Sequence, residues 1–117
     1  MDYKRGDIVL VNFNPQKKKE EVGKVRPAII MSDTDLNDVL DLVSVIALTT
    51  NLIEDSEPLR IRIKKREALK VDSDAMIEQL RSISKERIKE RVATVSEEEM
   101  EKIAYGVKLM LGLHQTL

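Results

Sequence analysis

The stretch Leu42-Val43-Ser44-Val45-Ile46-Ala47-Leu48-Thr49 is an almost unbroken apolar run, and a second threonine, Thr50, follows it. Continuous runs of this length, rich in β-branched residues, are typical of strands buried on both faces. Residues 27–32 form a second run of this kind, and residues 7–13 read as a third strand. Because proline cannot donate a backbone hydrogen bond, Pro27 is expected at the start of its strand. The sequence therefore predicts a mainly β fold.

The second half of the chain adds further strands. Residues 59–64 alternate without exception, with Leu59, Ile61 and Ile63 on one face and Arg60, Arg62 and Lys64 on the other. This pattern predicts a half-buried strand that displays a positive stripe. Residues 75–77 and 80–84 read as one strand or two short ones, and residues 85–91 as a charged connector. Residues 14–24 contain Pro15, Gly23 and a charge cluster, and they are expected to form a mobile loop.

One helix is predicted near the C-terminus. Ser96-Glu97-Glu98-Glu99 has the pattern of a capping box, in which the serine and the glutamate three residues later satisfy free amides of the first turn. An apolar face follows at helical spacing, made of Met100, Ile103, Ala104, Val107 and Leu111. Gly112 can end the helix in a left-handed conformation. Together with five or six strands, this helix predicts an α+β architecture, a small barrel capped by a C-terminal helix.

Length and composition narrow the classes of function. The 117 residues fit a single domain, 1–117, and they contain no run long enough to span a bilayer and no signal-peptide pattern, so a soluble cytoplasmic protein is expected. The chain has no cysteine and one histidine, His114, so no disulfide framework or thiolate metal site is expected, and no cofactor. A magnesium site made of carboxylates alone stays open, but the sequence has no recognisable motif for it. With a net charge of −1, any binding of nucleic acid must come from a local patch.

Four short segments occur in a fixed order, and each places a polar or cationic residue at the end of an apolar run. They are Arg5-Gly6-Asp7-Ile8-Val9, Gly23-Lys24-Val25-Arg26-Pro27-Ala28-Ile29-Ile30, Val45-Ile46-Ala47-Leu48-Thr49-Thr50 and Glu78-Gln79-Leu80-Arg81-Ser82-Ile83. This set resembles the MazF/PemK family of toxin endoribonucleases from Tyr3 to Leu113. The resemblance implies an SH3-like barrel of the CcdB/PemK type. It also implies a type II toxin–antitoxin system, in which a homodimer cuts single-stranded mRNA at specific sequences without a metal and an antitoxin protein inhibits it.

An enzyme that uses the 2′-hydroxyl of RNA as the nucleophile needs a base, a positive charge for the phosphorane and an acid for the leaving oxygen. Arg26 is the first candidate for the positive charge, because a guanidinium binds phosphate through two parallel hydrogen bonds. By resemblance, the family's catalytic arginine and threonine fall on Arg26 and Thr49. The alternatives are an arginine that solvates a strand end and a threonine that is simply a good β-former. A register slip of one residue would exchange the roles of Thr49 and Thr50.

The predicted loop supplies the candidate base. Glu21 lies five residues before Arg26, where the family has a glutamate near its active site, and its carboxylate could accept the 2′-hydroxyl proton or orient the arginine. The neighbouring lysines Lys17, Lys18 and Lys19 could clamp RNA. The alternative for this whole cluster is a set of charges that are only solvated.

The remaining candidates would line an RNA groove. Glu78, Gln79, Arg81 and Ser82 resemble the stretch that lines the groove in the family; alternatively, Glu78 and Arg81 form an ion pair that stabilises the barrel. Arg60 and Arg62, with Lys64, would offer phosphates a positive track, unless they are a solvated strand face. The chain has three aromatic residues, so bases would be recognised by hydrogen bonds and arginine stacking rather than by aromatic platforms.

Two other classes of function remain open at this point. One is a non-enzymatic toxin on the same barrel that binds a protein such as a DNA gyrase subunit, as CcdB-like proteins do; a C-terminal surface of Ile103, Val107, Leu111 and His114 would favour it. The other is an RNA-binding module without catalysis. The chain also departs from the family pattern, with Leu10 in place of an aromatic residue and Lys19 in place of a glycine, so the shape of the loop and the target sequence are not determined by the resemblance.

Overall fold

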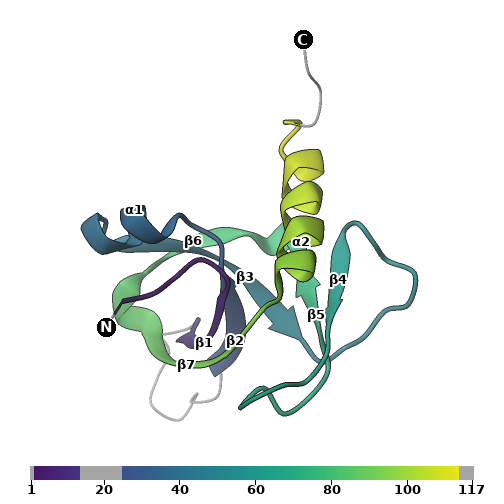
Figure 1. Ribbon diagram of the computed structural model, residues 1–117, viewed down its shortest axis with the longest axis horizontal. Coiled ribbons are helices and arrows are strands. Elements are labelled where there is room, and N and C mark those ends of the chain that lie inside the picture. Colours follow the sequence, from purple (N-terminus) through teal and green to yellow (C-terminus); the bar gives the residue numbers. More distant parts are fainter. Residues whose placement is uncertain (1, 14–24, 114–117) are drawn as a thin grey trace.

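The computed structural model describes residues 2–13 and 25–113, and within them the chain is mainly β (Figure 1). The strands are β1 (Asp7–Asn12), β2 (Val25–Ile30), β3 (Leu42–Thr49), β4 (Arg60–Ile63), β5 (Ser73–Met76), β6 (Arg81–Ser84) and β7 (Ile88–Thr94). The α-helices are α1 (Thr34–Val39) and α2 (Glu97–Met110), and two 3₁₀ turns, η2 (Ile77–Gln79) and η3 (Lys85–Arg87), flank β6. The predicted fold class is confirmed: antiparallel strands with a C-terminal helix.

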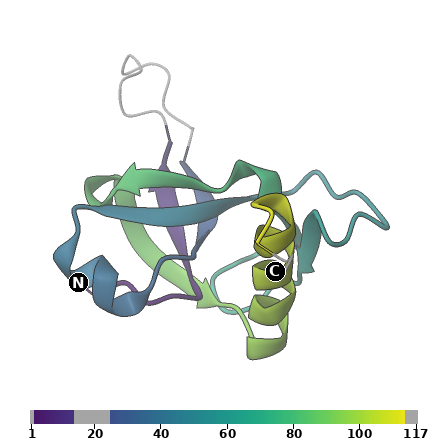
Figure 2. The same cartoon turned by 90° about the horizontal axis from the view of Figure 1, so that it is seen from above.

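The long strand β3 connects the two halves of the sheet. The strand order is β4-β5-β3-β2-β1-β7, and β6 pairs with the first half of β3 while β5 pairs with its end. Figure 2 shows β3 running the length of the barrel toward α2, with the loop before β4 extending beyond the helix. Because β3 has partners along its whole length and is covered on both sides, its sequence has few exposed positions.

Two apolar clusters fill the two sides of the sheet. One contains Ile46 and Leu48 of β3 and packs against Ile103 of α2. The other contains Val43 and Val45 of β3 and packs against residues of β1, β2, β6 and β7. The prediction that β3 is buried on both faces is therefore confirmed.

Helix α2 begins and ends as predicted. Ser96 and Glu99 form both bonds of the capping box, and Gly112 adopts a positive φ of 74°. Ile103 is fully buried, but Leu111 is the C-cap and is exposed, so it does not belong to the buried face as predicted. Gly106 faces the loop before β4 so closely that a Cβ there would lie 2.5 Å from the carbonyl oxygen of Pro58.

Several strand predictions need correction. The described ranges contain seven strands rather than five or six, because β5 and β6 are separate and the second half of the expected connector, residues 88–91, belongs to β7. Pro27 is the third residue of β2, not its first; it pairs with Leu10, while pairing with β3 begins at Ala28, so β2 has a partner on one side there and the missing amide costs no ladder bond. Helix α1 was not predicted. No helix in the described ranges is long and apolar enough to cross a membrane.

Candidate functional site

Arg26 and Thr49 belong to neighbouring strands and lie toward the same end of the sheet. Ala28 of β2 pairs with Ala47 of β3. In an antiparallel pair, moving two residues along each strand in opposite directions keeps both side chains on the same face. The pairing of β2 with β3 ends at Ala28 and Ala47, so Arg26 and Thr49 lie one such step beyond the last pair. The two side chains therefore share the face that carries Ala28 and Ala47.

Thr49 has an oxygen that accepts one hydrogen bond and a hydroxyl proton that can be donated to another group. Its Oγ1 accepts from the backbone amide of Asn51 at 3.1 Å. A hydroxyl is both donor and acceptor, so this contact leaves the O–H of Thr49 able to donate. Thr50 is the first residue after β3 and is exposed. The register therefore puts Thr49, not Thr50, on the face shared with Arg26.

Arg26 is exposed at the beginning of β2, and within residues 2–13 and 25–113 no salt bridge involves it. It pairs with Val11 of β1. A guanidinium in this position can offer its fork of N–H donors to a phosphate without first breaking an ion pair within the described part of the chain.

Glu21 and the lysines Lys17, Lys18 and Lys19 lie outside the described residues, as does His114.

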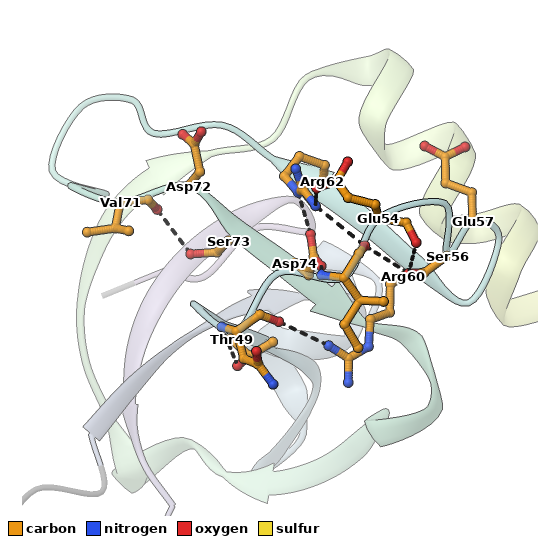
Figure 3. Close-up of polar contacts among 12 residues, drawn as sticks. Thr49, Glu54, Ser56, Glu57, Arg60, Arg62, Val71, Asp72, Ser73 and Asp74 are labelled. Carbon is orange, nitrogen blue, oxygen red and sulfur yellow. Dashed lines mark hydrogen bonds and ion pairs between the residues drawn. The ribbon is translucent and has the colours of Figure 1, made fainter.

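Next to Thr49, a buried carboxylate joins three segments (Figure 3). Asp74 of β5 pairs with Thr49, and it is 1% exposed. Its Oδ1 accepts from Arg62 Nε at 2.6 Å, and its Oδ2 accepts from the backbone amide of Ile53 at 2.9 Å. Arg62 also donates to Glu54 Oε2 at 3.0 Å. These contacts fix the loop that follows Thr49 against β4 and β5.

The charges of this cluster stabilise one another in the ionised form. Burial by itself would raise the pKa of Asp74, but the hydrogen bonds from Arg62 and Ile53 outweigh it and hold the pKa of the carboxyl below its usual value. The pKa of Arg62 is raised, first by its hydrogen bond to Asp74 and then by that to Glu54. Asp74 is therefore an ionised hydrogen-bond acceptor at neutral pH and not a proton donor.

The predicted positive stripe exists, but its two arginines are already in contact with carboxylates. Arg60 Nη1 donates to the carbonyl of Asn51 at 3.4 Å, and its Nη2 lies 3.9 Å from Glu78 Oε2. Arg62 is held by Asp74 and Glu54 as described above. Arg60 and Arg62 line a hollow of about 450 Å³ together with Asp74 and residues 53–57, which contribute three acidic side chains. RNA phosphates would have to compete with these carboxylates for both arginines.

The segment at β6 contributes a second group of predicted residues. Glu78 and Gln79 are exposed in η2. Arg81 pairs with Val45, and its guanidinium lies over the ring of Phe13 at 5.3 Å from the centroid. Ser82 is exposed, and its Oγ lies 3.4 Å from that of Ser44. The alternative ion pair between Glu78 and Arg81 is wrong, since Glu78 contacts Arg60 instead.

Sequence reasoning did not identify Asp74, Glu54 or Phe13 as part of this region. Asp74 lies 25 positions after Thr49 in the sequence, and its partner Arg62 is 12 positions away. The alternating run that contains Arg62 was recognised, and pairing it with residues 73–76 would have set Asp74 opposite Arg62. No group of three or more side chains suited to hold a metal ion is found among the described residues.

Comparison with known proteins gives a consistent result. The family model of the PemK-like, MazF-like toxins of type II toxin–antitoxin systems matches residues 4–111. The chain belongs to this family. The endoribonuclease MazF of Staphylococcus saprophyticus is 31% identical over 113 residues, which cover 95% of this chain and 92% of that protein. The toxin endoribonuclease predicted from the sequence is thereby confirmed, and it is favoured over the CcdB-like alternative.

Solved structures share the fold. The crystal structure of MazF from Deinococcus radiodurans superimposes with a TM-score of 0.77 at 22% identity, covering 96% of this chain and 98% of that one. A MazE–MazF structure from the same organism gives a TM-score of 0.77 at 18% identity, with 97% and 98% covered. At these identities the likeness concerns the fold, and the matched chains are spanned almost completely.

Proposed function

We propose that this toxin cuts single-stranded mRNA at specific sequences without a metal ion, and that Arg26 and Thr49 contact the phosphate that is cut. The observation that carries the proposal is the register of β2 and β3, which assigns a guanidinium and a hydroxyl donor to the same face and the same end of the sheet. Two hydrogen-bond donors, one of them charged, at adjacent strand ends suit a phosphate that gains negative charge in the transition state.

The proposed reaction uses the RNA itself as the nucleophile. The 2′-oxygen attacks the adjacent phosphorus, a base takes its proton, and the bond to the 5′-oxygen of the next nucleotide breaks as that oxygen is protonated. Arg26 stabilises the charge on the non-bridging oxygens, and Thr49 donates a hydrogen bond to one of them. The products are a 2′,3′-cyclic phosphate, which water can open to a 3′-phosphate, and a 5′-hydroxyl. Glu21 is proposed as the base that accepts the 2′-hydroxyl proton.

The same face would bind the neighbouring nucleotides. Groove residues proposed from the sequence are Lys17, Lys18, Lys19, Thr50, Arg60, Arg62, Glu78, Gln79, Arg81 and Ser82. Support differs among them. The amide of Gln79 and the hydroxyl of Ser82 are exposed, so they can reach a base, and Arg81 already stacks on Phe13 as it would on a base. Arg60 and Arg62 would first have to exchange their carboxylate contacts for phosphates.

Two protein partners complete the proposal: a second copy of the chain and an antitoxin. The aliphatic side chains of the strands are mostly buried within the barrel, so they are not available as a dimer contact. Exposed apolar side chains instead gather at α1 and the beginning of β3, where Leu36, Val39, Leu40 and Leu42 are each about half exposed or more. Such a patch supports a homodimer. The MazE–MazF structure of Deinococcus radiodurans and a mycobacterial endoribonuclease in complex with its cognate antitoxin share this fold and support an antitoxin, which would compete with RNA for the proposed groove.

The protein-binding alternative has less support in the structure. The surface that would favour it requires Ile103 of α2 to be accessible, but this side chain is fully buried in the core between the helix and the sheet. Val107 is partly buried against the same core, and of the three residues only Leu111 is exposed. No continuous apolar surface therefore joins these residues of the helix.

The proposal is tested by incubating the purified protein with a long single-stranded RNA in excess EDTA and mapping the fragment ends. Wild type should give cuts at one sequence with 5′-hydroxyl ends, and Arg26→Ala should abolish them. Arg5→Ala is the matched control, because it removes the same charge near the opposite end of β2, where Gly6 bonds to Ile30. If folded wild-type protein leaves the RNA intact in EDTA and Mg²⁺ restores cleavage, the metal-free mechanism is excluded.

A further inference from the structure

Asp74 has the features of a functional residue, but neither the family resemblance nor the proposed reaction gives it a role. Its side chain is the most deeply buried of the ionised groups in the region, with 2% of its surface accessible. It is paired in register with Thr49 on one side and with Arg62 on the other. Thr49, Asp74 and Arg62 thus form a row across the three neighbouring strands β3, β5 and β4. Asp74 stands next to the proposed catalytic threonine in that row.

The two oxygens of Asp74 and the guanidinium of Arg62 hold both sides of one peptide segment. Asp74 Oδ2 accepts from the amide of Ile53, while Arg62 Nη2 donates to the carbonyl of the same residue at 3.5 Å. Asp74 Oδ1 closes the ring by accepting from Arg62 Nε. Ile53 is four residues beyond Thr49, so this ring fixes the short segment whose amide at Asn51 bonds to Thr49 Oγ1.

We propose that Asp74 is a positioning residue for the cleavage reaction: through Arg62 and the Ile53 amide it holds residues 50–54 so that the Asn51 amide fixes the Thr49 hydroxyl toward the scissile phosphate. This inference rests on the proposed function. The proton of a hydroxyl that makes no hydrogen bond rotates among three staggered positions. Because the Asn51 amide donates to Thr49 Oγ1, the hydroxyl proton of Thr49 must point away from Asn51 and can be donated to the phosphate. Small errors in the placement of a reacting group can cost on the order of a hundredfold in rate.

Charge explains why Asp74 needs Arg62 in this role. A lone carboxylate one strand away from Thr49 would repel the phosphate that Thr49 is proposed to contact. Arg62 Nε, at 2.6 Å, offsets that charge, and the remaining Asp74 oxygen is used by the backbone. The carboxylate can therefore hold the segment without opposing RNA binding, and its low pKa keeps it an acceptor through the neutral range.

The test is the kinetics of Asp74→Asn, measured on a short RNA that contains the cleavage sequence. The variant keeps the shape of the side chain but presents an amide N–H₂ group to Arg62, which breaks the ring. We expect kcat to fall on the order of tenfold or more, while KM changes less than about twofold. Asp72→Asn is the matched control, because it removes the same charge from the same hairpin, while the asparagine Oδ1 can still accept from the Lys65 amide. Its kcat should stay at the wild-type value.

A double variant tests whether the ring itself matters. In Asp74→Asn/Arg62→Gln, the glutamine oxygen falls where Arg62 Nε was and can accept from the new asparagine, so the hydrogen bond is restored with reversed polarity and without charge. We expect kcat to recover at least severalfold relative to Asp74→Asn. Hydrogen exchange at the Asn51 and Ile53 amides, which does not depend on cleavage, should be faster in Asp74→Asn and slower again in the double variant.

The outcomes separate this inference from the function on which it rests. If wild type cuts RNA and Asp74→Asn loses thermal stability while its kcat is unchanged, Asp74 is a structural residue and the inference is overturned. Unchanged amide exchange in Asp74→Asn would overturn it as well. If wild type does not cut RNA at all, the proposed function fails, and the catalytic part of the inference fails with it.

Discussion

Two arginines of the β4–β5 hairpin each hold a carboxylate at 2.6 Å, yet the two contacts serve different neighbours. Arg62 binds Asp74 in the row that contains Thr49. Arg66, in the turn of the hairpin, binds both oxygens of Glu99 at 2.6 Å and so joins the hairpin to the first turn of α2. The same pair of residue types thus holds a loop beside the candidate site in one place and a helix to the barrel in the other. We expect loss of the Arg66 contact to affect stability and loss of the Arg62 contact to affect catalysis.

The largest effect on stability is expected from Glu99→Ala. This change leaves Arg66 without its bidentate partner and removes the bond from Glu99 Oε1 to the Ser96 amide. Breaking a partly buried pair and a capping box together should cost about 2–3 kcal/mol of unfolding free energy. Urea denaturation measures this loss, with Glu98→Ala as a control in the same turn. A matching drop of kcat in Glu99→Ala, far below its Tm, would contradict the distinction between the two contacts.

The packing of α2 gives the next effect. A Cβ at Gly106 would lie 2.5 Å from the carbonyl oxygen of Pro58, so Gly106→Ala must shift the helix or the loop before β4. Overpacking of this kind typically costs about 1–3 kcal/mol, although the same change in an open helix would be stabilising. Gly112→Ala isolates backbone strain, because its Cβ would meet nothing within 4 Å but its φ of 74° disfavours any side chain, and it should cost about 1–2 kcal/mol. A gain of stability in Gly106→Ala would mean that the contact with Pro58 relaxes at little cost.

The pH dependence of stability gives a smaller, graded effect. Burial would raise the pKa of Glu99, but the bonds from Arg66 and Ser96 prevail and the pKa is lowered in the folded protein. A lowered pKa stabilises the fold fully above the unfolded value, which is 4.5, and this contribution is lost as the pH falls through the folded value. Wild type should therefore lose stability below about pH 4.5, and Glu99→Gln should lose less over the same range. Urea midpoints between pH 6 and pH 3 compare the two slopes.

These two contacts also mark where sequence reasoning succeeds and fails. The capping box of α2 was predicted because all its information lies in four consecutive residues, and β3 and β4 were predicted because their patterns are continuous or strictly alternating. Strand β7 was mistaken for a connector because its register against β1 shifts twice, which brings the adjacent residues Glu90 and Arg91 to exposed positions. Helix α1 spans six residues, too few for a periodic pattern, and it starts from the cap Asp33.

The candidate site also contains residues that the sequence predicts and residues that it does not. Arg26 and Thr49 could be predicted as candidates because each belongs to a recognisable local segment, and the structure adds that both side chains lie on one face of the sheet. Asp74 was not found, because its importance depends on pairing between strands that are distant in the sequence. The predicted stripe of Arg60 and Arg62 was found from alternation, but alternation says nothing about Glu54 and Asp74, which occupy the guanidinium of Arg62.

The smallest effect is expected from Glu54→Gln, which sharpens the role of Arg62. Glu54 is 79% exposed, so its ion pair with Arg62 contributes little to folding, and the Tm should stay within about 1 °C of wild type. Without this carboxylate, one side of the Arg62 guanidinium becomes available to a phosphate. RNA affinity should then rise about two- to threefold at low salt, and the rise should fade as salt screens the charges.

Glu57→Gln decides how that gain is read, because Glu57 belongs to the same loop but its carboxylate lies 3.6 Å from Lys102 of α2. Both changes remove one negative charge from nearly the same place, so a general effect of net charge would raise RNA affinity equally in both. A gain confined to Glu54→Gln would mean that Glu54 and RNA compete for Arg62, which would then serve the site twice, once through Asp74 and once through the substrate. No gain in either variant would remove Arg62 from the RNA groove and leave it the single task of holding the segment after Thr49.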